Sequence, residues 1–494
     1  MLALIERLRR MNPPRLDSEA LILAVFVSAA LLVAAAIPNA DALIGEYGFY
    51  GDFDSEYIPY FVVGALLVLA IAFAILLNWR LGVMLLAASL PFQEKLAAGP
   101  IASVPKMLAL LTLFSVGLKV LHDREFLTKL WRLVHQPLFI CLIILVLWSM
   151  SSLLWADYRM TAVIKTSTFG GLAAFALIVG LLEKNWLYTL WIILAFSAFL
   201  SVPLGFILPG PAGFEEEGRF TSGGLHPNDY GGLLVCVFFV AYFILSEKLR
   251  AAKYIIVPTL FAVFFYGVFA SQSRAALLAF LMAPLLLLIV PAVRVRSLRF
   301  VILIFSLAIV MLMSILYVDP SVGEKIVTRY QALSEFQSAE TWSGRWSIWG
   351  GAVRVIASDP LIGVGAGNFP SAVYEYSFQA GIMEASRQGS ATAHNTFLAM
   401  AAELGVIGLA LFLGVLIFAG RRAKVLASRN STVGIGLLYA FTAYVIMGLA
   451  TTWETQKIAY IIYGSILSVT LAAQTTEYKR EDQAPDGKSS ADTS

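Results

Sequence analysis

The chain has little charge and few of the side chains on which most soluble enzymes depend. Asp, Glu, Lys and Arg make up 14% of its 494 residues, against about 25% in a typical soluble domain, and only two residues are cysteine. Cys141 and Cys236 both fall within apolar runs, which argues against a disulfide framework. No histidine or carboxylate pairs have metal-ligand spacing, and no P-loop is present. We therefore expect no metal site, no cofactor and no nucleotide as an energy source.

Long apolar runs take the place of the missing charge. Hydrophobic residues make up 59% of the chain and the mean hydropathy is +0.80. A transmembrane helix needs about 20 mainly apolar residues, so the sequence predicts an all-α polytopic membrane protein with about 12–14 transmembrane helices. The runs lie near 20–37, 58–77, 80–92, 105–121, 137–155, 163–182, 186–208, 228–246, 254–270, 275–291, 299–317, 396–419, 432–450 and 457–474.

The same runs divide the chain into five parts. Residues 1–19 form a basic N-terminal segment, 20–317 hold membrane helices with short loops, and 318–395 form one long polar loop carrying short helices. Membrane helices return over 396–474, and the polar segment 475–494 is predicted to be a disordered tail. The net charge of +3 is too small to indicate a nucleic-acid partner.

Basic residues predict the orientation, because Lys and Arg favour the cytoplasmic side of short loops. With the N-terminus inside, the cytoplasmic segments hold most of the basic clusters, whereas the acidic segment 38–57 contains no Lys or Arg and is external. Both termini are then cytoplasmic, and 318–395 lies outside. The basic clusters are Arg7, Arg9, Arg10; Lys119, Arg124, Lys129, Arg132; Arg294, Arg296, Arg299; and Arg421, Arg422, Lys424.

The long external loop contains two recognisable stretches. Residues 343–357 place Trp346, Trp349 and other apolar side chains at near-helical spacing, which predicts an amphipathic helix on the membrane surface. Asp359-Pro360 ends that helix, and the glycine-rich stretch 363–367 is predicted to be a mobile turn.

Three arginines are predicted to lie on the external side: Arg219 and Arg274 at helix-flanking loops, and Arg345 at the start of the surface helix. The planar guanidinium group matches phosphate oxygens and stays charged at physiological pH. Each has a structural alternative, since Arg274 would also serve as an interfacial anchor, Arg219 would pair with neighbouring glutamates, and Arg345 would extend toward water along its helix. Their common side favours an anion-binding site.

His394 lies where the long loop re-enters the membrane, and an imidazole with a pKa near 6.5 can act as a general base. The alternative is a helix-capping role, which Asn395 also suits. His226 precedes a proline at a helix start, which favours a turn. Glu403 lies two turns into a predicted span, where a carboxylate is costly and is therefore functional, paired with a neighbouring helix or extended toward water.

Taken in order, these residues resemble the O-antigen ligase family of bacterial inner-membrane glycosyltransferases. The resemblance covers about residues 200–420. It ends on His394-Asn395, nine further residues, Gly405, two residues and Gly408. The earlier matching positions are Gly218-Arg219, Gly223, Pro227-Asn228, Gly231-Gly232, Ser273-Arg274-Ala275, Gly344-Arg345, Trp349 and the stretch from Pro360 to Phe369.

The resemblance implies transfer of a glycan from undecaprenyl diphosphate to an acceptor hydroxyl on the periplasmic face of the inner membrane. Arg219, Arg274 and Arg345 would bind the diphosphate, and His394 would activate the acceptor. Asn395, Asn228, His226 and Glu403 would support them, while Gly405 and Gly408 would allow close helix packing. The acceptor would be lipid A-core or a growing polysaccharide.

Other functions remain open from the sequence. Polysaccharide polymerases of the same family have been described by an arginine and a glycine with ten residues between them, a spacing that Arg354 and Gly365 meet and that Arg219 misses by one residue. A flippase or transporter would be expected to show repeats and midplane charges. A scaffold of a polysaccharide machine would not need Arg219, Arg274 and His394 on one side.

Overall fold

The computed structural model describes residues 58–93, 96, 103–206, 219–249, 253–318, 344–379, 392–429 and 431–481. Over these residues the chain is helical and contains no strand, and nine of the helices there are long and apolar enough to cross a membrane. Helices satisfy their own backbone hydrogen bonds, as the lipid interior requires. The predicted class, an all-α polytopic membrane protein, is confirmed.

The nine span-length helices are α6 (Val104–His122), α8 (Pro137–Ser151, continued by η3, Ser152–Leu154), α9 (Arg159–Gly180), α10 (Lys184–Leu204), α11 (Pro227–Lys248), α14 (Arg294–Val318), α18 (Thr396–Ser428), α19 (Thr432–Ala450) and α20 (Lys457–Glu481). Four further apolar helices are α4 (Ile58–Leu77), α5 (Trp79–Ser89, continued by η2, Leu90–Phe92), α12 (Lys253–Ala270) and α13 (Arg274–Leu286, continued by η5, Leu287–Ile289). All of them lie where spans were predicted. The predicted span 20–37 and the segment 1–19 lie outside the described residues.

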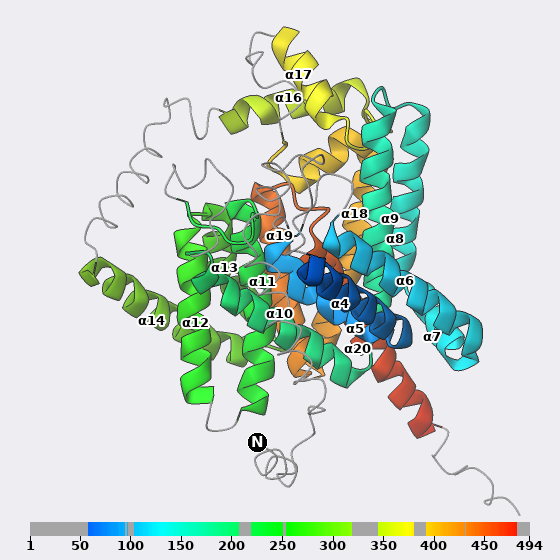
Figure 1. Cartoon of the computed structure of the whole chain (residues 1–494). Coiled ribbons are helices and arrows are strands. Elements are labelled where there is room, and N and C mark those ends of the chain that lie inside the picture. The colour runs from blue at the N-terminus through cyan, green and yellow to red at the C-terminus, as the bar shows by residue number, and fades with distance from the viewer. Residues whose placement is uncertain are drawn as a thin grey trace, which may run out of the picture.

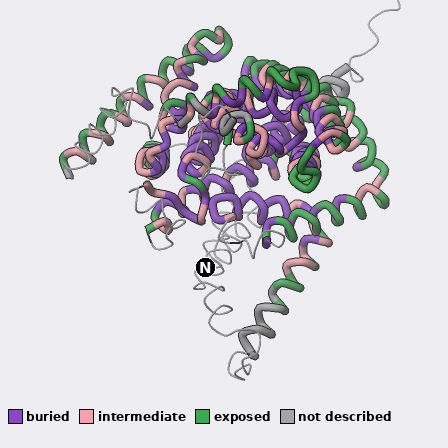
Figure 2. The backbone as a smooth tube through the Cα atoms, turned by 90° about the horizontal axis from the view of Figure 1, so that it is seen from above, coloured by how far each residue is buried: buried purple, intermediate pink, exposed green. Residues whose placement is uncertain are grey.

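Helices α11 and α19 form the centre of the bundle. Every residue from Tyr230 to Ala241 on α11 is buried, as is every residue from Val433 to Phe441 on α19. A helix that is apolar and buried on all sides belongs in the interior of a bundle. Figure 2 shows this buried centre surrounded by helices that are exposed on their outer faces.

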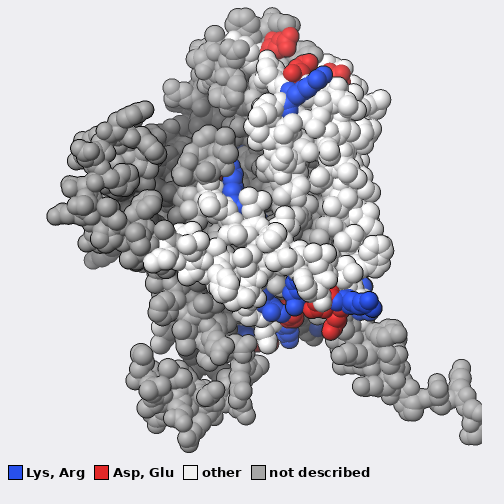
Figure 3. Space-filling view, turned by 45° about the vertical axis from the view of Figure 1, so that its right-hand side comes forward, with Lys and Arg blue, Asp and Glu red and all other residues white. Residues whose placement is uncertain are grey.

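The exposed outer faces are apolar, as in a protein surrounded by lipid. Leu110 on α6, Leu147 on α8 and Val310 on α14 are each more than half exposed. In Figure 3 the visible charged side chains gather mainly near the top and bottom of the molecule, and much of the surface between is uncharged. These features match a lipid-facing belt between two water-facing ends.

One helix at a water-facing end was not predicted. Residues after His122 form α7 (Arg124–Val134), which the sequence reading treated as a loop. The Asp123 carboxylate caps it by accepting from the N–H of Phe126 at 3.0 Å, and Phe126 and Leu133 are buried beneath it. A short helix stabilised by a cap and tertiary packing has little periodic signal of its own.

The described parts of the long loop form a small lobe above the bundle (Figure 1). We define the cap lobe as α16 (Gly344–Ser358), α17 (Phe369–Gln379), the linking loop 359–368 and residues 392–404 at the start of α18. Its core is separate from that of the bundle and contains Ile348, Ala352, Val355, Phe369, Val373, Ala393, Ala399 and Ala402. The helix predicted at 343–357 is present, but part of its apolar face is buried in this core.

Two helices run further than predicted. Helix α18 extends past residue 419 to Ser428, and it therefore contains the basic residues that were assigned to a loop. Helix α20 extends to Glu481, past the predicted start of a disordered tail at residue 475. Arg and Lys are good helix formers and are favourable near the C-terminus of a helix, so polarity alone did not mark the end of either helix.

Candidate active site

Arg219 joins the start of α11 to the turn before α13. Its Nη2 donates to the Asn228 side-chain oxygen at 3.0 Å, and its Nε donates to the Ser271 carbonyl at 3.4 Å. The neighbouring N–H of Phe220 donates to the Ala270 carbonyl at 3.0 Å. The guanidinium group is thereby fixed close to the N-terminus of α13. The glutamates proposed as alternative partners lie outside the described residues.

Arg274 and Arg345 belong to distant segments but interact electrostatically. Arg274 is the first residue of α13, whose N-terminus is capped by the Ser273 hydroxyl. Arg345 lies in the first turn of α16, where burial, followed by the positive charge of Arg274, lowers its pKa. The fold thus brings a cation of the cap lobe toward a cation of the bundle.

His394 lies close to Arg345, one of these two cations. Its pKa is lowered to about 4, first by burial, then by the charge of Arg345 and then by His226. Its backbone has φ 46°, in the left-handed region, and its Nε2 lies 3.2 Å from the Thr392 hydroxyl. At neutral pH the imidazole is therefore uncharged and can accept a proton.

His226 and Asn395 cap helices. The His226 Nδ1 accepts from the N–H of Asn228 at 3.2 Å at the start of α11. The Asn395 side-chain oxygen accepts from Phe397 and Leu398 at the start of α18, while its Nδ2 donates to a carbonyl at the end of α19. The turn role predicted for His226 and the capping alternative for Asn395 describe these contacts.

Every predicted site residue described so far lies within two residues of a helix N-terminus, except Arg219, which lies in the loop that precedes α11. The helices are α11, α13, α16 and α18, three of which begin at a side-chain cap. Helix N-termini carry unpaired N–H groups and a partial positive charge, which favour bound anions. The arrangement therefore combines fixed cations, positive helix ends and one neutral imidazole.

A short segment between α19 and α20 connects these helix starts. We call residues 451–454 the strut. The Trp453 indole donates to the Asp229 carboxylate at 2.7 Å, and the Trp453 backbone N–H donates to the Thr396 hydroxyl at 2.7 Å. The Thr396 hydroxyl in turn donates to the Thr451 carbonyl at 3.0 Å. The sequence analysis did not identify Asp229 and Trp453, which are hydrogen-bonded to each other but lie far apart in the sequence.

Helix α18 is interrupted at Gly405, which has φ 67° and ψ −171°. A side chain at Gly405 would collide with the carbonyl of Leu361. The prediction that Gly405 lets a continuous helix pack closely is therefore wrong, because this glycine provides a backbone conformation that breaks the helix. A short half-helix, residues 396–404, carries His394 at its start.

The loop 359–368 satisfies the hydrogen-bonding groups that this interruption frees. The N–H groups of Val364 and Gly365 donate to the carbonyls of Ala402 and Glu403 at 3.0 and 2.9 Å. In the other direction, the N–H of Val406 donates to the Pro360 carbonyl at 2.8 Å. The expectation of a mobile turn over 363–367 is wrong, because this backbone completes the broken helix.

Glu403 is buried and paired. Its carboxylate lies 2.8 Å from the Lys165 ammonium on α9, and that ammonium lies 2.8 Å from Glu454 at the end of the strut. Of the alternatives for Glu403, pairing with a neighbouring helix is the one observed. Lys165 and Glu454 were missed, although a lysine within the predicted span 163–182 was itself a signal of a functional or paired charge.

Gly408 also differs from the expectation. A side chain there would meet Leu404 of its own helix, so Gly408 accommodates the break and not a neighbouring helix. The two other histidines, His122 and His135, are exposed. Over the described part of the chain, no three His, Cys, Asp or Glu side chains form a group that could hold a metal ion.

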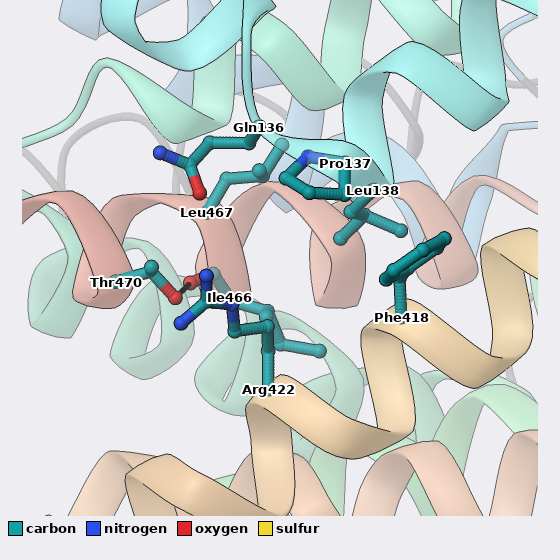
Figure 4. A pocket seen from close by; sticks show the side chains of 8 residues that line it. All are labelled: Gln136, Pro137, Leu138, Phe418, Arg422, Ile466, Leu467 and Thr470. Atoms are coloured by element: carbon teal, nitrogen blue, oxygen red, sulfur yellow. Dashed lines mark hydrogen bonds between the residues drawn. The ribbon is translucent and has the colours of Figure 1, made fainter.

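A small hollow lies at the opposite ends of the helices. Gln136, Arg422 and Thr470 line it, at the start of α8 and near the C-terminal ends of α18 and α20 (Figure 4). It is separated from His394 by the length of α18, and it is not part of the candidate active site.

Comparison with known proteins agrees with the resemblance noted in the sequence. No curated protein matches the chain. Residues 259–413 match the family model described as O-antigen ligase, and this region contains Arg274, Arg345 and His394, whereas Arg219 lies before it. This match, which covers less than half of the chain, supports assignment to the O-antigen ligase family, whose members are glycosyltransferase-like enzymes.

Proposed function

We propose that this protein transfers a glycan from undecaprenyl diphosphate to an acceptor hydroxyl on the periplasmic face of the bacterial inner membrane. The observation that supports this most is the mutual repulsion within the site. Burial and Arg274 lower the pKa of Arg345, and burial and Arg345 lower that of His394. Cations held together in this way are stabilised when a multiply charged anion binds between them.

A lipid-linked diphosphate has the matching chemistry. Its phosphates would be bound by Arg219, Arg274 and Arg345, with the N-termini of α11 and α13 adding partial positive charge. The apolar outer faces of the helices suit its lipid chain. As the bond between the sugar and the phosphate oxygen breaks, negative charge grows on that oxygen, and fixed cations in a water-poor site lower the barrier.

His394 acts on the other reactant. Its neutral imidazole accepts the proton of the acceptor hydroxyl while the acceptor oxygen forms its bond to the anomeric carbon of the sugar. The bonding electrons of the broken bond leave with undecaprenyl diphosphate, so atoms and charge balance without a redox step. A bound diphosphate also stabilises the imidazolium that forms, because opposite charges lie close together.

Purified protein given a lipid-diphosphate-linked repeat unit, with and without lipid A-core, tests the proposal. A ligase transfers the glycan once and only when lipid A-core is present. A polymerase, which the Arg354 and Gly365 spacing keeps as a second candidate, lengthens the glycan without added acceptor. Absence of transfer by correctly folded protein, together with movement of the donor across the bilayer, contradicts the proposal and favours a transporter.

A further inference from the structure

Two buried carboxylates and one partly buried ammonium group lie together beneath the candidate active site. The Lys165 ammonium on α9 contacts the carboxylates of Glu403 on α18 and Glu454 on the strut, both at 2.8 Å. The Glu403 and Glu454 side chains are 5% and 2% exposed, so neither charge is balanced by bulk water. Lys165 is the single cation between two carboxylates that belong to different segments of the chain.

Glu403 connects Lys165 to the cap lobe. It lies in the half-helix 396–404, whose first turn follows His394. Its Oε2 also accepts a hydrogen bond from the N–H of Gly367 at 2.8 Å, in the loop that follows α16. Because α16 carries Arg345, one carboxylate fixes both the segment of the general base and the segment of a phosphate-binding arginine.

Glu454 connects Lys165 to the bundle side of the site. It directly follows Trp453, whose backbone holds Thr396 and whose indole holds Asp229, each at 2.7 Å. Asp229 adjoins Asn228, the partner of Arg219. Through the strut, the same ammonium group therefore fixes the starts of α11 and α18 relative to each other.

We propose that Lys165 is a positioning residue that holds His394 of the cap lobe in register with the arginines, through its two ion pairs to Glu403 and Glu454. This inference rests on the proposed function, since it concerns the geometry of that reaction. A buried ion pair adds little net stability compared with apolar packing, so its value here lies in fixing two segments in one arrangement. Displacing a reacting group by about 1 Å can reduce a rate about 100-fold.

Kinetics of three variants and one control test the proposal. Lys165→Met removes both ion pairs, Lys165→Arg retains a cation, and Glu403→Gln weakens the cap-lobe connection by replacing the ion pair with a neutral acceptor, while leaving Lys165 and Glu454 balanced in charge. The matched control is Arg80→Met. It removes the ion pair between Arg80 and Glu183, at 2.7 Å, which lies just beyond the C-terminal end of α9, whereas Lys165 lies near the N-terminal end of that helix. We expect Lys165→Met to lower kcat about 100-fold with the KM for donor changed less than about threefold.

The conservative variants Lys165→Arg and Glu403→Gln distinguish a role of Lys165 in positioning His394 from a role in the stability of the fold alone. Lys165→Arg is expected to recover kcat to within about tenfold of the wild type, and Glu403→Gln to lower kcat about tenfold at an unchanged melting temperature. Arg80→Met leaves kcat unchanged. If Lys165→Met misfolds because two buried carboxylates lack a cation, Glu403→Gln alone decides the outcome.

Hydrogen exchange provides a readout that does not depend on transfer activity. In Glu403→Gln, and in Lys165→Met if it folds, amides of 360–367 and 396–404 are expected to exchange faster than in the wild type and in Arg80→Met. If the variants exchange faster but the wild type itself shows no transfer activity, the proposed function is refuted. The structural role of Lys165 in connecting the two segments would then still hold. Unchanged exchange and unchanged kcat in Glu403→Gln would overturn the positioning role, as would a raised KM at constant kcat, which indicates direct donor contact.

Discussion

His394 is held in two unfavourable states, as expected for the general base that we propose. Its φ of 46° is a left-handed conformation that costs a residue with a side chain about 1–2 kcal/mol. Its imidazole is desolvated and faces Arg345, which lowers its pKa to about 4. Strain of this kind persists where the surrounding structure fixes it, most often at active sites.

Replacing His394 by asparagine tests its role without adding strain, because asparagine tolerates positive φ better than most residues. We expect His394→Asn to lower kcat by about 10²–10⁴-fold, the usual contribution of a general base, with little change in melting temperature. Transfer assays and thermal unfolding measure the two effects. Near-normal transfer by His394→Asn would exclude a base at this position.

The pH profile provides a second test at this residue. The profile of kcat/KM reports the free enzyme, so its acid limb is expected near pH 4, where His394 becomes protonated. The acid limb of kcat reports the donor complex and is expected at higher pH, because a bound diphosphate stabilises imidazolium. Coincident limbs would argue against an anion bound beside His394.

Arg345 is expected to determine the pH at which the acid limb of kcat/KM lies. Arg345→Gln removes a positive charge that lowers the His394 pKa, so the acid limb of kcat/KM moves to higher pH. Arg354→Gln, which changes an exposed arginine on the same helix, is the matched control and leaves the limb in place. An equal shift in both variants would show a general charge effect and contradict a specific contact.

The free energy of unfolding is expected to depend on pH through the same His394 imidazole. The pKa of His394 is about 6.5 in the unfolded chain and about 4 in the folded protein. Between these two pH values the unfolded state therefore binds more protons than the folded state. The contribution of His394 to stability is therefore complete above pH 6.5 and is lost as the pH falls toward 4. Chemical unfolding of the wild type and His394→Asn over this window measures the difference.

The site residues at helix ends were predictable, whereas their supports were not. Arg219, Arg274, Arg345 and His394 are conspicuous because polar side chains are rare in this chain and these four border apolar runs. Trp453 carries no such signal, since an aromatic residue beside a span is common at membrane interfaces. Its partner Asp229 is more than 200 residues away and is known only from the fold.

At the level of elements, the interrupted α18 organises the site. Its half-helix 396–404 packs with the cap lobe through Ala399 and Ala402 and with the bundle through Met400 and Leu404, while the longer part after Gly405 packs in the bundle. The Trp148 indole donates to the Leu404 carbonyl at 2.9 Å, and the Trp155 indole donates to the Gly363 carbonyl at 3.0 Å. Helix α8 and the turn after it therefore stabilise the interruption from the bundle side.

Gly405→Ala is expected to destabilise the protein by more than about 1 kcal/mol, because alanine is strained at this φ and its methyl group would meet the Leu361 carbonyl. Gly414→Ala is the matched control on the same helix, where a methyl group would make an ordinary contact at 3.5 Å with Cys141. That change is expected to be neutral or to stabilise by about 0.5–1 kcal/mol. Thermal unfolding in detergent measures both, and equal effects would contradict the interruption.

The positions of the membrane helices followed from their apolar runs, but the break in α18 did not. A glycine in an apolar run is equally compatible with close packing and with a helix break. The distinction depends on residues 360–365, which supply the hydrogen-bond partners at 405 from some 40 positions earlier in the chain. Only the tertiary arrangement shows that these two segments complete each other.

At the scale of the whole molecule, the candidate active site lies where the cap lobe meets the bundle. Arg219 and Arg274 come from the bundle, whereas Arg345 and His394 come from the cap lobe. Each part has its own apolar core, and the two are joined by backbone hydrogen bonds, by the Lys165 ion pairs and by Ala366, Met400 and Leu404, which pack into the bundle core. We call this boundary between the cap lobe and the bundle the seam.

The predicted orientation places this seam outside the cell interior, and cysteine labelling tests it. In spheroplasts, a membrane-impermeant thiol reagent is expected to label Arg354→Cys and not Arg132→Cys, while Cys236 is buried and stays unlabelled. The half-buried Cys141 is replaced by serine in both variants. Labelling of residue 132 alone would invert the topology and move the site to the cytoplasm.

The central claim is that the general base His394 and the diphosphate-binding arginines act in one reaction. The measurement that tests it is a single-turnover reaction of wild type and His394→Asn with labelled lipid-diphosphate-linked glycan, following glycan transfer and donor binding together. We predict that both proteins bind the donor within about threefold of each other and that the variant transfers at least about 100-fold more slowly. Equal transfer rates, or loss of donor binding alone, would contradict the account.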